Sequence, residues 1–102
     1  MLKWFYRIGC SVILIAAAGP ALAADADHGL TLAKRWCAAC HIVESGQKTA
    51  TEAPPFASIA KRPDFDAAKI AFFLLDPHPK MPNMQLTRNE TSDIAAYIAT
   101  LK

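Results

Sequence analysis

Residues 26–41 read ADHGLTLAKRWCAACH, and this stretch decides the fold of the chain. Apolar residues recur in it at steps of three and four positions, as they do on one face of an α-helix. They are Leu30, Ala33, Trp36, Cys37 and Cys40. Asp25 or Asp27 stands where a helix N-cap belongs. The pattern therefore predicts a helix over residues 26–41 with one buried face.

The last five residues of this stretch, Cys37-Ala38-Ala39-Cys40-His41, form a C-x-x-C-H motif. This spacing is typical of covalent haem attachment. Positions i and i+3 lie on the same side of a helix, so both thiols could add to the two vinyl groups of one haem. The adjacent His41 could then bind the iron through its imidazole. We therefore expect one haem c, bound through Cys37 and Cys40.

Two other interpretations of the motif have less support. A structural zinc site requires four nitrogen or sulfur ligands, and only His28 or His78 could complete the set. Consecutive Cys40 and His41 also rarely chelate one ion from a helix. A redox-active dithiol of the thioredoxin type would need a βαβ setting, and the sequence has no strand pattern to supply it. The motif therefore favours haem.

The middle of the chain predicts a loop and two helices. Residues 42–55 mix Ser, Gly, Thr and a double Pro without periodicity, as loops do. A short helix is expected over residues 56–62. Asp64 stands as an N-cap ahead of the apolar residues 65–75, which predict a second main helix.

A capping box near the C-terminus predicts the third main helix. Thr87 and Glu90 have the spacing at which each side chain satisfies the other's backbone N–H. Apolar residues then mark one helical face up to the end of the chain. We therefore predict an all-α fold with three main helices, plus short helices and loops wrapped around the haem.

Residues 76–83, DPHPKMPN, contain three prolines and predict a stiff, extended loop. Met81 lies in this loop. A haem that only transfers electrons is best six-coordinate, because a second protein ligand excludes oxygen. A thioether ligand favours ferrous iron and raises the reduction potential. Met81 is therefore a candidate iron ligand.

The N-terminal residues 1–23 have the layout of a cleaved secretory signal peptide. Lys3 and Arg7 precede an apolar run, and Ala21-Leu22-Ala23 offers a cleavage site. The run covers only residues 8–18, whereas a membrane-spanning helix needs about twenty apolar residues. We therefore expect a periplasmic domain of residues 24–102 without a permanent membrane span.

Removal of Lys3 and Arg7 changes the charge balance of the mature chain. Nine basic residues would then stand against nine acidic ones, so the domain would be close to neutral. No basic excess remains to indicate nucleic acid or an anionic membrane as a partner.

Taken together, the motifs of residues 24–102 resemble those of the small bacterial class I cytochromes c. The shared motifs are C-A-A-C-H (37–41), A-P-P-F (53–56), M-P-N (81–83) and A-Y-I (96–98). The resemblance implies that His41 is the proximal iron ligand and Met81 the distal one, with Met84 as the rival. It also implies that the carbonyl of Pro54 accepts the N–H of the proximal histidine, which would fix its tautomer.

The resemblance carries structural expectations as well. The first and last helices should cross, with Gly29 allowing a close approach and Tyr97 packing near Ala33. The core and haem wall should be formed by Phe56, Ile59, Phe72, Phe73, Leu74 and Ile98. Scattered basic residues, among them Lys61 and Arg62, should belong to an ordinary solvated surface or else surround the haem edge.

By the same resemblance, the protein should be a monomeric one-electron carrier whose partners are a donor and an acceptor redox protein. Two alternatives remain. The chain could be an electron-entry subunit of a larger oxidoreductase. It could also hold a five-coordinate haem that binds gases or acts as a weak peroxidase, if neither Met81 nor Met84 binds iron. His78 is a further, less favoured iron ligand.

Overall fold

The computed structural model describes residues 9, 11–14, 23–50, 53–76 and 81–102. Within these residues the chain forms four helices and no strand: α1 (Ala26–Trp36), α2 (Phe56–Ala60), α3 (Ala67–Leu75) and α4 (Arg88–Ala99). The predicted all-α class is confirmed. Most of the proposed signal peptide, residues 1–23, lies outside the described residues, so its cleavage stays a prediction.

Helix α1 begins as expected but ends before the C-x-x-C-H motif. Asp25 is its N-cap, and the Asp25 side chain accepts a hydrogen bond from the backbone N–H of His28. The helix ends at Trp36, and residues 37–40 form turns. The predicted helical continuation to His41 is therefore wrong.

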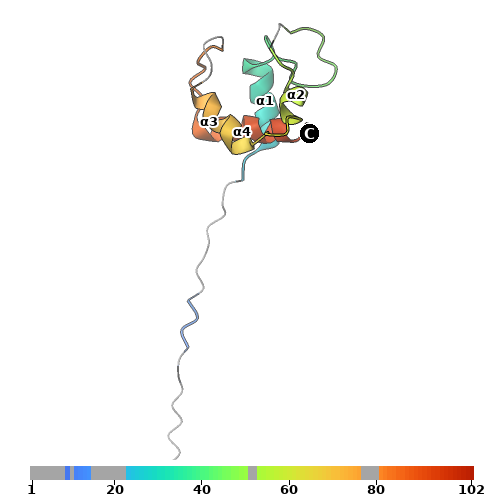
Figure 1. Cartoon of the computed structure of the whole chain (residues 1–102). Helices are drawn as coiled ribbons and strands as arrows, with labels where there is room; N and C mark the ends of the chain where they lie inside the picture. Colours follow the sequence, from blue (N-terminus) through green and yellow to red (C-terminus); the bar gives the residue numbers. More distant parts are fainter. Residues whose placement is uncertain (1–8, 10, 15–22, 51–52, 77–80) are drawn as a thin grey trace, which may run out of the picture.

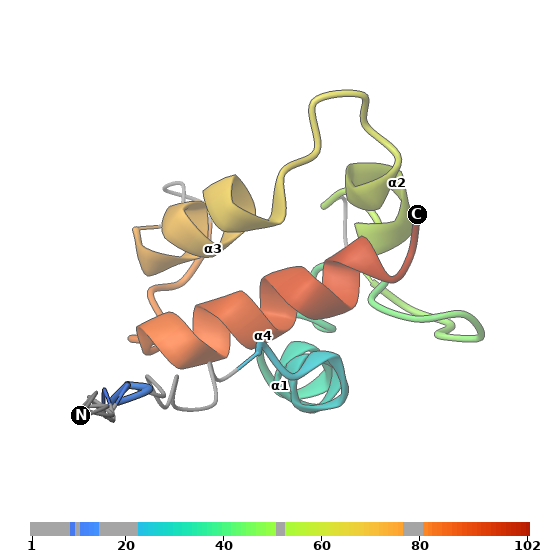
Figure 2. The ribbon, with the colours of Figure 1, turned by 90° about the horizontal axis from the view of Figure 1, so that it is seen from below.

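Helices α1 and α4 cross in direct contact (Figures 1 and 2). A Cβ atom added at Gly29 would collide with the backbone carbonyl of Asp93 and press on the Cβ of Tyr97. Only a residue without a side chain fits here, because the two backbones touch at this point. The expected close approach at Gly29 is confirmed.

Helix α3 starts two residues later than predicted. Its N-cap is Asp66, whose carboxylate accepts hydrogen bonds from the N–H groups of Ala68 and Lys69. Asp64 instead lies in a turn that is closed by a hydrogen bond from the N–H of Phe65 to the carbonyl of Arg62. The turn places the ring of Phe65 against the core.

Helix α4 carries the predicted capping box. The N–H of Glu90 donates to the Thr87 hydroxyl, and the N–H of Thr87 donates to the Glu90 carboxylate. Three of its residues, Ile94, Tyr97 and Ile98, are buried in the core between α1 and α3. Helix α4 is therefore the central support of the domain.

The core ties the loop after α1 to α4. Val43 is almost fully buried, and its carbonyl accepts a hydrogen bond of 2.5 Å from the hydroxyl of buried Tyr97.

No helix among the described residues is both long enough and apolar enough to cross a membrane.

Candidate cofactor site

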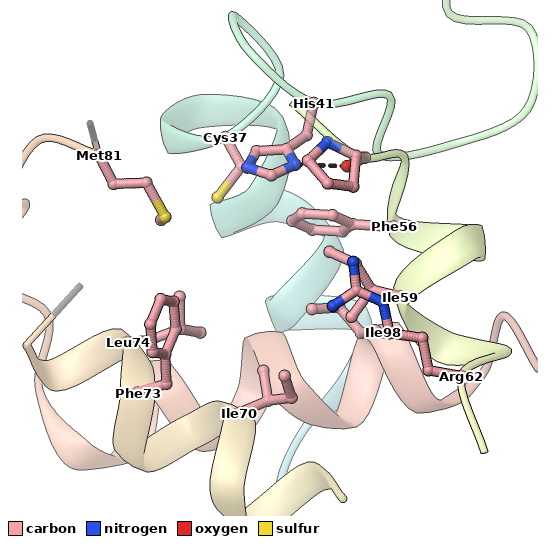
Figure 3. A pocket seen from close by; sticks show the side chains of 11 residues that line it. Cys37, His41, Phe56, Ile59, Arg62, Ile70, Phe73, Leu74, Met81 and Ile98 are labelled. Carbon is pink, nitrogen blue, oxygen red and sulfur yellow. Dashed lines mark hydrogen bonds between the residues drawn. The ribbon is translucent and has the colours of Figure 1, made fainter. Parts of the chain in front are cut away.

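A cavity of about 290 Å³ lies between the turn that follows α1, helices α2, α3 and α4, and the loop before α4 (Figure 3). Most of the residues that line it are apolar. They are Cys37, His41, Pro54, Phe56, Ile59, Arg62, Ile70, Phe73, Leu74, Met81 and Ile98. The volume is close to the lower end of the range of about 300–1,000 Å³ for small-molecule sites.

The turn after α1 places Cys37 and His41 at this cavity. The backbone N–H groups of Cys40 and His41 both donate to the carbonyl of Cys37, which closes the turn. Cys37 is buried and lines the cavity, whereas Cys40 is exposed and is not among the lining residues. The two thiols therefore do not share one helical face, as a helix through the motif would have required.

Burial also changes the chemistry of Cys37. Desolvation, reinforced by the nearby Cys40, raises the pKa of the Cys37 thiol from 9.0 to about 11. Without an attached group, Cys37 is a neutral thiol at neutral pH.

The imidazole of His41 is held by a backbone carbonyl at the cavity wall. Its Nδ1 lies 2.6 Å from the carbonyl oxygen of Pro54, and the side chain is buried (Figure 3). Because a carbonyl can only accept, Nδ1 carries the proton and Nε2 keeps a free lone pair. In this tautomer, Nε2 is the nitrogen that is available to bind a metal ion.

Phe56 supports the same imidazole from α2. The two ring centroids are 5.2 Å apart, with a tilt of 51° between the planes. The backbone N–H of Phe56 donates to the carbonyl of Ile42, the residue after His41. The A-P-P-F segment therefore holds His41 by a hydrogen bond, a ring contact and a backbone link.

Met81 reaches the cavity from the side opposite to His41. Figure 3 shows its sulfur directed into the space between the loop before α4 and the His41 ring. Met84 is half-buried, but it is not among the residues that line the cavity. The structure thus brings Met81, and not its rival, together with His41, Cys37 and Pro54.

The apolar wall differs from the sequence expectation at one residue. Phe56, Ile59, Phe73, Leu74 and Ile98 line the cavity as expected. Phe72, however, is 78% exposed, so its assignment to the core or haem wall is wrong. Helix α3 has an apolar residue at nearly every position, and its periodicity therefore gives little sign of which side faces the core.

Arg62 is one of the scattered basic residues for which the sequence leaves open a place on the solvated surface or at the haem edge. It is exposed overall, yet it lies among the lining residues, and Figure 3 shows its guanidinium beside Ile59. Nothing in the sequence distinguished Arg62 from Lys61 beside it, because the turn after α2 decides which of the two side chains reaches the cavity.

The alternative ligand sets find no support in the described part of the chain. No group of three or more His, Cys, Asp or Glu residues there could hold a metal ion, as a zinc site would need. His28 instead pairs with Asp93, with 2.8 Å between Nδ1 and Oδ2. The suggestion that His78 binds iron falls outside the described residues.

Comparison with known proteins agrees with this site. Residues 24–98 match the family described as cytochrome c oxidase, cbb3-type, subunit III. The chain therefore belongs to this family of c-type cytochromes. It is also 59% identical over 95 residues to cytochrome c-552 of Bradyrhizobium diazoefficiens, covering 91% of each chain. No solved structure matches the chain.

Family membership confirms the fold and the cofactor expected from the sequence. The protein is a small c-type cytochrome that transfers electrons and carries one covalent haem c through the Cys37-x-x-Cys40-His41 motif. The cavity fits this group, because an imidazole with a free Nε2, a thioether and a cysteine thiol converge on an apolar space. Its partners are redox proteins.

Proposed function

We propose that the protein is an exported, one-electron carrier whose haem iron is bound by His41 and Met81. The observation that supports this most strongly is the placement of both side chains in one apolar cavity, entering from opposite sides. When bound, haem c supplies an Fe(III)/Fe(II) couple that accepts and releases one electron.

The residues around His41 would prepare it for this role. The Pro54 carbonyl keeps the proton on Nδ1, so Nε2 is available as the proximal ligand. A hydrogen bond of this kind also makes the imidazole a better electron donor to the metal. Buried Phe56 would limit the rotation of the imidazole, because the two rings are in tilted contact.

The residues on the other side would set the potential. The Met81 thioether, as distal ligand, would favour ferrous iron. The apolar wall lowers the local dielectric, which disfavours the more highly charged ferric centre. Both effects raise the reduction potential.

Arg62 would contribute the positive charge of the site. It is the only lining residue, among those the structure describes, with a permanently charged side chain. A guanidinium matches carboxylates in a bidentate manner, so Arg62 is suited to pair with a haem propionate.

Export would deliver the mature domain to the periplasm. We propose that residues 1–23 are removed as a signal peptide and that residues 24–102 function there as a soluble monomer, with a donor and an acceptor protein as partners. Mass spectrometry of the exported protein tests the cleavage: a mature N-terminus at Ala24 is expected, and retention of Met1 would contradict it.

In the second candidate function, the same haem site belongs to a subunit of a permanent complex. The match to a family described as an oxidase subunit is the observation that supports an electron-entry subunit as this second candidate. Size-exclusion chromatography of the protein from its native membranes and periplasm separates the two. A free monomer supports the carrier, whereas constant co-purification at a fixed ratio supports the subunit.

Carbon monoxide binding tests the proposed six-coordinate iron against the five-coordinate alternative. If Met81 occupies the distal position, the untreated ferrous protein should bind carbon monoxide slowly or not at all. Rapid, stoichiometric binding would contradict the carrier proposal and support a gas-binding or peroxidase-like site.

A further inference from the structure

Gln47 makes an unusual number of hydrogen bonds for a loop side chain. Its Oε1 accepts from the backbone N–H of Val43 at 2.9 Å. Its Nε2 donates to the carbonyls of His41, Ala38 and Thr49, at 2.8, 3.0 and 3.1 Å. An amide nitrogen has two hydrogens, so these three acceptors share them.

These bonds satisfy two carbonyls of the motif that no helix pairs. Even in a helix ending at His41, the carbonyls of Ala38 and His41 would be among the last four, which have no partner within the helix. The helix ends at Trp36, and the side chain of Gln47 satisfies both carbonyls instead. Gln47 therefore closes the turn that carries Cys40 and His41.

The loop brings Gln47 to this position through a tight turn. Gly46 has φ +83°, a backbone conformation that favours glycine, and the N–H of Gln47 lies 3.4 Å from the carbonyl of Glu44. This reversal directs the half-buried Gln47 side chain back onto residues 38–43. The sequence motif gave no sign of this contact, because Gln47 follows His41 by six positions in an unpatterned loop.

His41 is consequently held at both ends. Its ring is fixed by the carbonyl of Pro54, and its own carbonyl is fixed by Nε2 of Gln47. Gln47 is not among the residues that line the cavity, so it can act on the cavity only through the backbone groups that it binds, of which the His41 carbonyl belongs to a lining residue. A small rotation of that backbone would swing the ring relative to any group that its Nε2 binds.

We propose that Gln47 is a positioning residue for the axial histidine, which fixes the ring plane of His41 by clamping its backbone carbonyl. The inference rests on the proposed ligation of the haem iron by His41. Outer-shell groups that orient a metal ligand commonly matter almost as much as the ligand itself.

The test compares Gln47→Ala and Gln47→Glu with wild-type holoprotein. Proton NMR of the ferric protein reports the ring plane of His41 through the iron-shifted signals of its ring protons and of the haem methyl groups. Hydrogen exchange of the Val43 amide in the ferrous protein reports the bond to Oε1. Lys48→Ala, an exposed change in the same loop, is the control.

The two variants should distinguish the effect of the Gln47 bond to Val43 from that of its bond to His41. Gln47→Ala removes all four bonds, so the His41 ring signals should shift and Val43 exchange should accelerate about fivefold to tenfold. Gln47→Glu keeps an acceptor for Val43 but cannot donate to the His41 carbonyl. It should therefore shift the ring signals while changing Val43 exchange much less.

A second comparison excludes a merely structural role. Tyr97→Phe removes the hydrogen bond to the Val43 carbonyl but none of the hydrogen bonds of His41. It should therefore lower the stability of the domain but leave the His41 ring signals in place. Unchanged ring signals in both Gln47 variants, with covalent haem present, would overturn the proposal. Absence of iron-shifted His41 signals in wild type would instead overturn the ligand assignment, and with it this role of Gln47.

Discussion

Nδ1 of His41 lies 2.6 Å from the carbonyl oxygen of Pro54, thirteen residues further along the chain. This contact joins the haem-attachment turn to the loop before α2, and it fixes which imidazole nitrogen faces the cavity. The resemblance implied that the A-P-P-F segment supplies this acceptor, and in the structure the carbonyl of Pro54 does so. The orientation of the proposed proximal ligand is thus set by a backbone carbonyl, which side-chain substitution alone does not remove.

Gly29→Ala should destabilise the domain severely. In an ordinary helix interior this change gains stability, because Ala is the better helix former by about 1 kcal/mol. Here the new Cβ would collide with the Asp93 carbonyl, so α1 and α4 would have to separate. We expect a loss of about 2 kcal/mol or more in the free energy of unfolding, measured by guanidinium denaturation.

Thr31→Ala provides the control for this prediction, because Thr31 is exposed on the same helix. It should change the free energy of unfolding by less than about 0.5 kcal/mol. If Gly29→Ala were as stable as Thr31→Ala, the close crossing of α1 and α4 would be wrong.

Tyr97→Phe should weaken the link between α4 and the loop after His41. The change removes the hydroxyl that donates to the buried Val43 carbonyl and leaves this acceptor without its partner. A loss of about 1–3 kcal/mol in the free energy of unfolding is expected from chemical denaturation. Thr100→Val, which removes a hydroxyl hydrogen bond at an exposed position, should lower the free energy of unfolding much less. Equal losses in the two variants would show that the bond from Tyr97 to Val43 does not stabilise the fold in this way.

The His28–Asp93 pair should make stability depend on pH. The hydrogen bond that His28 donates to the Asp93 carboxylate, with the charges of Asp93, Asp25 and Glu90, raises the pKa of His28 above 6.5. Burial alone would raise the pKa of Asp93, but hydrogen bonds from His28 and from the Asp25 backbone lower it below 3.8.

The sign of the effect follows from these two directions. The His28 contribution is complete below pH 6.5 and is lost as the pH rises through its pKa in the folded protein. The Asp93 contribution is complete above pH 3.8 and is lost as the pH falls through its lowered pKa. The pair therefore stabilises the fold most between these two values.

His28→Gln should remove this dependence. The difference in Tm between wild type and variant should be largest near about pH 5 and should shrink toward about pH 9. Asp27→Asn retains the pair and should keep the wild-type profile. A constant Tm difference across this range would show that the pair does not form.

Arg62→Gln should lower the reduction potential. Loss of a positive charge beside the cavity stabilises the ferric state, which is the more positive one, relative to the ferrous state. A decrease of some tens of millivolts is expected in a spectroelectrochemical titration. Lys61→Gln removes a charge from an exposed neighbour outside the cavity and should have a smaller effect. Equal shifts would mean that Arg62 acts only through net charge.

Much of the fold could be predicted because it follows from local signals. The capping box at Thr87 and Glu90 lies where the sequence indicates, and so does the N-cap, at Asp25, the first of its two candidates. The crossing at Gly29 was implied by the resemblance and not by a local signal. The end of α1 could not be predicted in this way. Apolar spacing continues through Cys40, but the carbonyls of the motif pair with the Gln47 side chain from the next loop.

The candidate site, too, was only partly predictable from the sequence. The C-x-x-C-H motif and Met81 are visible in the sequence, and both reach the cavity through Cys37, His41 and Met81 itself. Gln47 is not visible in the sequence, and Arg62 could not be distinguished there from the other basic residues, because turns rather than periodic elements position both side chains. Phe72 was misplaced for a related reason: a helix that is apolar on most sides does not reveal which side is covered.

The ligation of the iron by His41 and Met81 is the central claim, and one spectroscopic comparison tests it most directly. Wild type, Met81→Ala and Met84→Ala are exported in a host that matures c-type cytochromes, and the long-red absorption of each ferric protein is recorded. We expect a Met-to-iron band in wild type that persists in Met84→Ala and is lost in Met81→Ala. Loss only in Met84→Ala, or no such band in wild type, would contradict it.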